Sequence, residues 1–333
     1  MNANTMQAAV LQRFGAPLAL TEVEIPPLRP GQVLVRVAAS GVNPLDTKIQ
    51  AGNAAHAQAS LPAILGIDLA GTMEAVHAGE TRFQPGDEVY GMTGGVGGVP
   101  GSLAQFAAVD ADLLAIKPRT LDMRQAAALP LIFITAWEGL VDRARVHAGQ
   151  KVLVHGGAGG VGHMAVQVAL AAGAEVYATG SAEQRNVIES LGATFINYRT
   201  QSVDDYVALH TGGEGFDVVY DTVGGATLDA SFAAARRYHG HVVSCLGWGA
   251  HKLAPLSFRA ATYSGVFTLL PLLSGRERAH HGDIMREATR LADAGRLRVL
   301  MDERRYTLAQ ANEAQAVVAA GQARGKLVVD VAV

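Results

Sequence analysis

The fold of this chain is decided by one glycine-rich stretch, Gly157-Ala158-Gly159-Gly160-Val161-Gly162. Residues 151–155 (KVLVH), directly before it, are mostly apolar and β-branched, as a buried strand requires. Residues 163–172 (HMAVQVALAA), directly after it, place apolar side chains at helical spacing. The stretch therefore matches the pattern G-x-G-x-x-G in the order strand, turn, helix, and this order makes the pattern informative.

Each glycine of this pattern has a physical task. Gly157 permits the tight turn, Gly159 lets the backbone approach a pyrophosphate, and Gly162 lets helix and strand pack closely. The phosphates then bind to free N–H groups at the positive end of the helix, around Gly160 and Val161. We therefore expect a dinucleotide-binding site. The alternative is a purely structural glycine turn in a parallel sheet.

The pattern of hydrophobic residues along the chain changes near residue 121. After that point helical stretches alternate with short apolar runs, which is typical of parallel strands joined by crossover helices. The runs lie at residues 152–155, 175–179, 195–197, 218–220 and 241–246. Two helices, at residues 283–294 and 309–320, and a closing strand at residues 326–331 are expected to follow.

The first 125 or so residues are predicted to be rich in β-structure. Residues 33–38 (VLVRVA) alternate apolar and polar side chains, as in a half-buried strand. Frequent Gly, Pro and Asp residues separate such short segments, which favours a barrel or sandwich. Residues 91–101 (GMTGGVGGVPG) are expected to form a turn or a mobile lid.

The composition limits the classes of function. A length of 333 residues, with 49% hydrophobic and 17% charged residues, is typical of a globular protein with two domains. The net charge of −3 gives no general electrostatic reason to bind nucleic acid or an anionic membrane. The sequence has no apolar run of about 18 residues, and residues 1–12 do not resemble a signal peptide. We therefore expect no membrane span and a cytoplasmic location.

Cysteine and histidine give little support to metal binding. Cys245 is the single cysteine, so intrachain disulfides are impossible and a reducing compartment is expected. Its place in an apolar run predicts a buried strand thiol rather than a nucleophile. The pair His239 and His241, near a strand, and the adjacent His280 and His281, in an expected loop, have no third partner at ligand spacing.

The choice of dinucleotide depends on the end of the second strand of this half, which reads Thr179-Gly180-Ser181. An NAD site places Asp or Glu there to bind the ribose hydroxyls. Glu175 lies at the wrong end of the strand, so no carboxylate is expected at the site. The Ser181 hydroxyl and the Arg185 guanidinium instead suit a 2′-phosphate, because a charge-assisted hydrogen bond contributes about 1.5–3 kcal/mol. This favours NADP(H), although Arg185 alone could be a solvated helix residue.

Four segments together resemble the medium-chain dehydrogenase/reductase superfamily, and most of all its zinc-free quinone oxidoreductase branch. They are residues 41–47 (GVNPLDT), 65–71 (LGIDLAG), 156–162 (GGAGGVG) and 216–224 (FDVVYDTVG). The resemblance implies an α/β fold with two domains and the cofactor in the cleft between them. A β-rich GroES-like catalytic domain would span residues 1–125 and be completed by 271–333, and a Rossmann domain with a doubly wound parallel sheet would span 126–270. The family commonly dimerises through a Rossmann edge strand, so a homodimer is expected by analogy.

The sequence departs from the zinc-dependent members of this superfamily at the metal. The positions that resemble the zinc ligands of those enzymes carry Asn43, Ile67 and Leu131. Aliphatic side chains cannot coordinate zinc, and an amide is a poor ligand for it. No catalytic metal is therefore expected.

The resemblance also marks candidate site residues. Asn43 could donate to the acceptor oxygen or to the cofactor ribose, or it could be a turn residue before Pro44. Lys48 could orient an acceptor carbonyl or a ribose hydroxyl, or it could be a solvated surface lysine; Leu45 replaces the hydroxyl residue of the familiar proton relay. Thr135 would pack on the nicotinamide ring or simply begin a helix.

Two further regions are implied at the ends of the cofactor. Tyr198 resembles a tyrosine near the 2′-phosphate, although its position alone suggests a strand-end aromatic residue. Val266 and Phe267 would line the nicotinamide end, or they could be ordinary core residues.

Without a Lewis acid, the expected chemistry is hydride transfer from NADPH to an electron-poor small molecule, a quinone or an α,β-unsaturated carbonyl. One alternative is an alkenal or enoyl double-bond reductase without quinone activity. Another is a protein that binds NADPH and reduces nothing, serving as a sensor, since no obligatory acid or base can be named.

Overall fold

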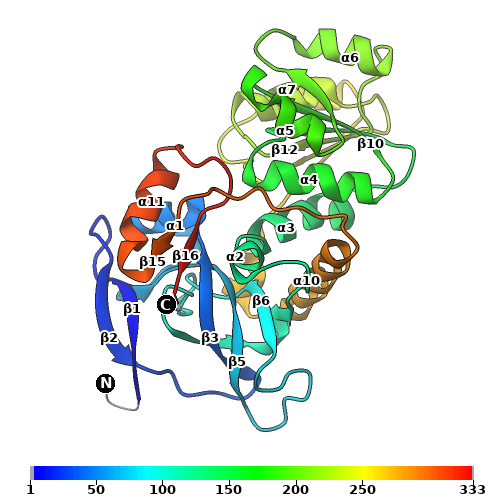
Figure 1. Ribbon diagram of the computed structural model, residues 1–333. Helices are drawn as coiled ribbons and strands as arrows, with labels where there is room; N and C mark the ends of the chain where they lie inside the picture. The colour runs from blue at the N-terminus through cyan, green and yellow to red at the C-terminus, as the bar shows by residue number, and fades with distance from the viewer. Residues whose placement is uncertain (1–3, 332–333) are drawn as a thin grey trace. The chain divides into compact units, whose positions relative to one another are not determined.

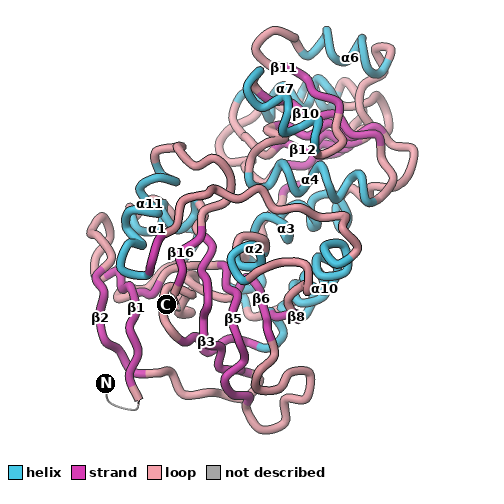
Figure 2. Tube along the Cα trace, viewed as in Figure 1, coloured by secondary structure: helices cyan, strands magenta, loops and turns pink. Residues whose placement is uncertain are grey.

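The computed structural model describes residues 4–331, and the contacts divide the chain into two compact units. Unit 1 comprises Met1–Leu131 and Leu269–Val333, and unit 2 comprises Ile132–Thr268. Unit 1 is rich in antiparallel strands and unit 2 contains a parallel sheet with helices (Figures 1 and 2). The predicted α/β class is therefore confirmed. The predicted domain bounds, after residues 125 and 270, remain a prediction.

Unit 2 is built on a six-stranded sheet in which all neighbouring strands are parallel. From edge to edge the strands are β11 (Thr194–Asn197), β10 (Glu175–Gly180), β9 (Lys151–His155), β12 (Val218–Asp221), β13 (His241–Ser244) and β14 (Thr262–Gly265). The chain starts at β9, runs outward to β11, and then returns to β12 on the other side of β9. Ligands of such sheets bind at the carboxyl ends of the strands where the order reverses, which here is the end of β9.

The central strands of unit 2 are buried on both faces, as parallel strands between helices must be. Leu153, Val219 and Val242, from β9, β12 and β13, are fully buried in one core cluster with Phe216 and Phe232. The helices around the sheet are α4 (Gly160–Ala171), α5 (Arg185–Ser190), α6 (Val203–Thr211), α7 (Ala226–Ala234) and α8 (Ala254–Ser257). Helix α3 (Pro130–Trp137) leads into unit 2 and continues as the π-helical segment η3 (Glu138–Arg143).

Unit 1 is organised by the long strand β3 (Gln32–Gly41), which pairs antiparallel with β5, β7 and β16. Its seven-stranded sheet also contains β5 (Asp68–Val76), β6 (Glu88–Met92), β7 (Phe106–Asp110), β8 (Leu114–Ile116), β15 (Tyr306–Thr307) and β16 (Val328–Asp330). A second sheet has the order β2 (Ala19–Glu24), β1 (Thr5–Leu11) and β4 (Ala63–Ile64). Because β16 pairs with β3, the end of the chain completes the sheet begun near its start (Figure 1).

The helices of unit 1 are α1 (Pro44–Gln50), α2 (Met123–Ala127), α9 (Leu270–Ser274), α10 (Arg278–Asp293) and α11 (Ala311–Ala319). Helix α10 begins five residues earlier than the sequence pattern predicts, at Arg278, whose guanidinium donates to Asp110 Oδ2 at 2.8 Å. His280 and His281 are therefore helical rather than part of a loop, and His281 is fully buried.

Residues 91–101 form a packed turn rather than a lid. A Cβ on Gly94 would lie 2.1 Å from the Pro100 carbonyl oxygen, and one on Gly101 would lie 2.3 Å from that of Leu65. Gly95 has a φ of 76° and lies against Gly66. The glycines are needed because the backbone packs on itself and on Leu65 and Gly66, just before β5.

Across residues 4–331, no helix has both the length and the apolar character needed to cross a membrane.

Candidate functional site

The glycine turn lies between β9 and α4, with its first residues bonded to β10. The Gly157 N–H donates to the Thr179 carbonyl at 3.0 Å, and the Gly156 N–H donates to Thr179 Oγ1 at 3.1 Å. The left-handed residue of the turn is Gly156, with a φ of 72°. Gly157 is required for a different reason: its Cβ would lie 2.5 Å from the Ala178 Cβ.

The tightest contact of the turn is at Gly162. A Cβ at this position would lie 2.0 Å from the Gly156 carbonyl oxygen, well inside contact distance. The first turn of α4 therefore rests directly on the backbone that leaves β9. Close packing of helix and strand is the task that the motif gives to its last glycine.

The amino end of α4 is open to an anion. Gly159, the N-cap, and Gly160 are exposed, and no side chain caps the helix. The first N–H groups of a helix have no partner within the helix and carry its positive dipole end. In a twelve-residue helix at the switch point of the sheet, this arrangement can bind the phosphates of a dinucleotide.

A buried histidine, which sequence reasoning missed, joins three strand ends at the turn. His155, the last residue of β9, is 3% exposed, and its Nδ1 lies 3.2 Å from Thr179 Oγ1 in β10. Its carbonyl accepts a hydrogen bond from Thr222 Oγ1, just past β12, at 2.6 Å. Burial lowers the pKa of His155 to about 4, so the ring is neutral at physiological pH. A polar residue at the end of an apolar strand, directly before the glycines, was the available signal.

The expected phosphate ligand Arg185 is engaged elsewhere. Its guanidinium donates to Glu189 at 3.1 Å and lies 4.6 Å from the centre of the Phe195 ring. Ser181, also expected at this site, is 9% exposed, and its N–H donates to Gln184 Oε1 at 2.9 Å.

The neighbouring strand end carries a second arginine. Strands β10 and β11 are paired with Gly180 opposite Asn197, so Tyr198 and Arg199 follow β11 beside Ser181. Tyr198 is 53% exposed, and the Arg199 guanidinium lies 5.7 Å from its ring centre.

The expectation that this end has no carboxylate is wrong. A hydrogen bond with Ser181 and the charge of Arg199 both lower the pKa of Glu183, which places its carboxylate among these side chains. The sequence argument considered the end of the strand and did not consider the turn that follows it.

The nicotinamide candidates of unit 2 occupy different environments. Thr135, in α3, is 6% exposed, and its carbonyl accepts a hydrogen bond from the Tyr220 hydroxyl at 2.5 Å. Val266 is buried, whereas Phe267 is 37% exposed and packs edge-on against Trp248 with 6.2 Å between ring centres. Cys245 lies one residue past β13 rather than within it, and burial raises the pKa of its thiol to about 12.

In unit 1, Asn43 belongs to a buried polar network. The residue is fully buried; its Nδ2 donates to Asp68 Oδ2 at 2.8 Å, and its Oδ1 accepts from Lys326 Nζ at 2.5 Å. The Asn43 N–H donates to Asp46 Oδ2 at 2.9 Å, which fixes the start of α1. Both ends of the Asn43 amide are therefore occupied by charged partners.

The Asp68 carboxylate joins two of the positions that resemble zinc ligands. It accepts from Asn43 through Oδ2 and from the Leu131 N–H through Oδ1, each at 2.8 Å. Ile67, at the remaining position, is fully buried. Within the described part of the chain, no group of three or more His, Cys, Asp or Glu side chains could hold a metal ion.

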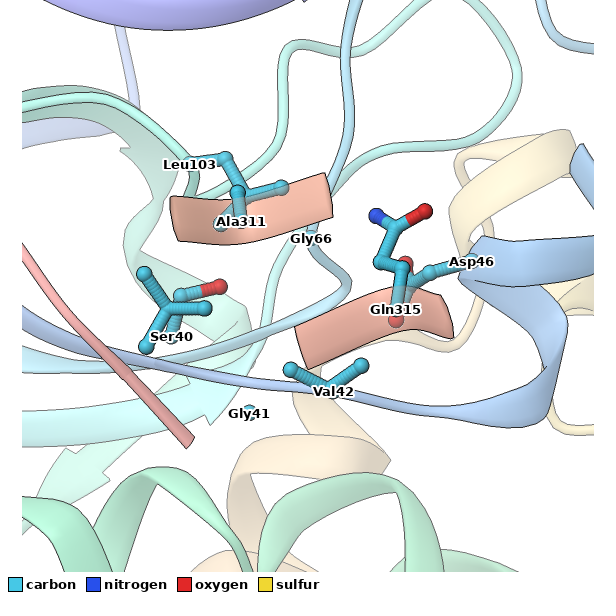
Figure 3. Close-up of a pocket in the computed structure, with 9 residues that line it drawn as sticks. Ser40, Gly41, Val42, Asp46, Gly66, Leu103, Ala311 and Gln315 are labelled. Atoms are coloured by element: carbon cyan, nitrogen blue, oxygen red, sulfur yellow. The ribbon is translucent and has the colours of Figure 1, made fainter. Parts of the chain in front are cut away.

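The network carries two carboxyl groups and one ammonium group. Burial raises the pKa of Asp46 to about 7 and that of Asp68 to about 6, and it lowers the pKa of Lys326. Ionised Asp68 balances the Lys326 charge, while a pKa of about 7 leaves Asp46 about half protonated at neutral pH. Figure 3 shows Asp46 and Gln315 at a small hollow. Asp46 Oδ1 and Gln315 Oε1 lack a hydrogen-bond partner among the described residues.

Lys48 lies outside this network. It is exposed in the last turn of α1, and its charge contributes to lowering the pKa of His56. Of the three catalytic candidates, Asn43 is buried in unit 1, Lys48 is at the surface of unit 1, and Thr135 belongs to unit 2.

Gly162→Ala is expected to weaken dinucleotide binding strongly, because the new Cβ and the Gly156 carbonyl cannot both keep their places. Overpacking typically costs about 1–3 kcal/mol, or roughly a tenfold to hundredfold loss of affinity if it falls on the turn. Fluorescence titration with NADPH measures the effect. Gly282→Ala, whose Cβ would lie 2.4 Å from the Asp112 carbonyl oxygen, overpacks a helix of unit 1 and is the control, which should keep the wild-type affinity. An equal loss of affinity in the two variants would contradict the assignment.

Asp46→Asn is expected to weaken the pH dependence of stability between pH 4 and 7. Because the pKa of Asp46 is raised from 3.8 to about 7 in the folded protein, its stabilising contribution is complete below the ordinary pKa and is lost as pH rises from there to about 7. Asparagine mimics the protonated form and removes this loss, which can reach about 1.4 kcal/mol per pH unit. Urea unfolding at several pH values measures it. Asp205→Asn is the control, since the pKa of Asp205 is lowered; parallel curves for wild type and Asp46→Asn would contradict the prediction.

Comparisons with known proteins agree with this architecture. The chain matches the family models "Alcohol dehydrogenase GroES-like domain" over residues 29–119 and "Zinc-binding dehydrogenase" over residues 191–329. A crystal structure of an alcohol dehydrogenase superfamily protein from Novosphingobium aromaticivorans is 55% identical, with a TM-score of 0.96, and covers 98% of this chain and 100% of that one.

Two named enzymes are also similar. An NADPH-dependent alkenal/one oxidoreductase from Arabidopsis thaliana is 30% identical over 97% of this chain and 79% of that protein. A quinone oxidoreductase from Sus scrofa is 35% identical over 67% of this chain and 68% of that protein. By its motifs, its fold and these matches, the chain belongs to the medium-chain dehydrogenase/reductase superfamily.

Proposed function

We propose that this protein is a zinc-independent, NADPH-dependent oxidoreductase that transfers hydride to a quinone or an α,β-unsaturated carbonyl compound. The observation that carries the proposal is the open glycine turn, in which Gly162 holds α4 against Gly156 and leaves the helix end exposed. The similar enzymes named for alkenal and quinone reduction support the choice of acceptor.

The turn fits the cofactor. The backbone at Gly157, Gly159, Gly160, Val161 and Gly162 holds the pyrophosphate, and NADPH when bound supplies the hydride. Thr135 and Phe267 would contact the nicotinamide ring. The protein must also orient the acceptor and stabilise the negative charge that develops on the acceptor oxygen.

The residues of unit 1 do not fit a catalytic zinc. Asn43 already bonds to an ammonium group at 2.5 Å, and Lys326 would repel a second cation at that place. Ile67 and Leu131 offer aliphatic side chains to the other two ligand positions. We therefore assign Asn43 a role within the network, and Lys48, which is exposed, the role of donor to the acceptor oxygen.

The acceptor is tested by mixing the protein with NADPH and a panel of quinones, enals and enones, and following cofactor absorbance. Oxidation with both classes of acceptor is expected. Turnover of enals and enones without any turnover of quinones would replace the proposal by a double-bond reductase. Tight NADPH binding with no turnover of any compound would contradict the enzyme assignment and favour an NADPH-binding sensor.

The preference for NADPH is assigned to Ser181, Tyr198 and Arg199. Arg199 lies at the end of β11 beside Ser181, whereas Arg185 is held by Glu189 and stacked on Phe195. Two or three donors around a 2′-phosphate give charge-assisted hydrogen bonds. The nearby Glu183 carboxylate opposes the phosphate and weakens the preference.

Arg199→Gln is expected to raise the Kd for NADPH by about tenfold or more and to leave that for NADH unchanged, since one charge-assisted hydrogen bond is worth about 1.5–3 kcal/mol. Arg185→Gln is the matched control with a smaller effect. Glu183→Gln should tighten NADPH binding. Titrations with both cofactors measure all three, and a larger loss for Arg185→Gln than for Arg199→Gln would return the phosphate site to Arg185.

A homodimer in a reducing compartment such as the cytoplasm completes the proposal. Strand β14 is the edge of the parallel sheet, and its Thr262 and Tyr263 are exposed, so it can pair with a second copy. The single cysteine suits a reducing environment. Light scattering should give twice the chain mass of 34.7 kDa.

A further inference from the structure

A tyrosine hydroxyl is buried between the parallel sheet of unit 2 and helix α3, where an apolar side chain could also pack. Tyr220 belongs to the central strand β12 and is fully buried, between Val219 and the buried Asp221. A buried hydroxyl costs free energy unless it is hydrogen-bonded. This one donates to the Thr135 carbonyl at 2.5 Å. Burial raises the pKa of Tyr220 well above its ordinary value, so the hydroxyl keeps the proton that it donates.

The acceptor lies where the helix changes form. Thr135 is in α3, which ends at Trp137 and continues as the π-helical segment η3. Within η3 the Ala144 N–H donates to the Gly139 carbonyl at 3.0 Å, five residues back. A π-helical segment is rare and frequently lies at a functional site. The Tyr220 hydroxyl therefore bonds to the helix three residues before its irregular part begins at Glu138.

The glycine of η3 is matched to the same tyrosine. A Cβ on Gly139 would lie 2.7 Å from Tyr220 Cζ and 2.8 Å from its hydroxyl oxygen. The ring thus occupies the space that a side chain at residue 139 would need. The Cys245 thiol contacts the same hydroxyl, and its raised pKa of about 12 keeps it uncharged. Gly139 and Tyr220 together bring the hydroxyl to Thr135.

We infer that Tyr220 is a positioning residue that sets the place of Thr135 against the nicotinamide ring. The inference rests on the proposed function, in which Thr135 makes that contact. Tyr220 touches neither cofactor nor acceptor; it acts by fixing the backbone of the helix that carries Thr135. Phenylalanine would fill the same volume in β12, so the hydroxyl contributes position and not packing.

Tyr220→Phe tests this inference because it removes the hydroxyl and keeps the ring. The Thr135 carbonyl then loses this hydrogen bond from the strand, and the helix can shift. A displacement of about 1 Å at a reacting group can cost up to about a hundredfold in rate, so we expect a tenfold to hundredfold slower single-turnover oxidation of NADPH. The Kd for 2′,5′-ADP, which lacks the nicotinamide, should stay within twofold of the wild-type value, while the Kd for NADPH rises.

Tyr206→Phe is the matched control. Tyr206 is a buried tyrosine of the same unit, 3% exposed in α6. It should leave the rate and both Kd values unchanged. Gly139→Ala, which pushes on the ring, should lower the rate as Tyr220→Phe does, provided circular dichroism shows that the variant folds.

Two outcomes would overturn the inference. One is a Tyr220→Phe protein that melts at a lower temperature yet oxidises NADPH at the wild-type single-turnover rate, because the hydroxyl would then be purely structural. The other is an equal loss of affinity for 2′,5′-ADP and NADPH, because the effect would not be specific to the nicotinamide end. If the wild type itself oxidises no NADPH with any acceptor, the proposed function fails; comparing the two Kd values still tests Tyr220.

Discussion

The contact between Gly156 and Gly162 is the constraint on which the rest of unit 2 depends. With 2.0 Å between the Gly156 carbonyl oxygen and the place of a Cβ on residue 162, the first turn of α4 is held against the end of β9. Strand β9 is also the strand from which the sheet order runs outward in both directions. The closest backbone packing of the unit and the place where α/β sheets bind ligands therefore coincide.

A different constraint governs unit 1, where buried charge must be balanced. Asp68 receives hydrogen bonds from Asn43 and from the Leu131 N–H, and Lys326 supplies the compensating charge. In zinc-dependent relatives a metal would join these positions; here a carboxylate does so. Burying such groups is costly unless every one is paired or protonated, which explains the raised pKa of Asp46 and its affinity for a proton. The hydrogen bonds of this network join α1, β5, α3 and the segment before β16. A carboxylate, and not an electrophilic metal ion, stands at its centre.

The sequence was sufficient where the signal is local. The glycine turn, the parallel strands and the α/β class follow from hydrophobic periodicity and glycine spacing, which the structure confirms. It was insufficient where a role depends on distant residues. Lys326 and Asn43 are 283 positions apart, and no pattern connects them. The contact of Arg185 with Phe195 needs the pairing of β10 with β11 before it can be foreseen. Likewise, the hydrogen bonds of Gly156 and Gly157 to Thr179 depend on the pairing of β9 with β10, which glycine spacing alone does not reveal.

Hydride transfer without a metal is the central claim, and isotope transfer tests it most directly. The purified protein is treated with a chelator, its zinc content is measured, and it is then given an enone and NADPH carrying deuterium at the nicotinamide C4. Deuterium is expected at the β-carbon of the saturated product, with far less than one zinc per chain. The rate should equal that of untreated protein given the same labelled NADPH. A rate that falls with the zinc content and returns when zinc is added would contradict this claim, as would a product without deuterium from NADPH labelled on either face of C4.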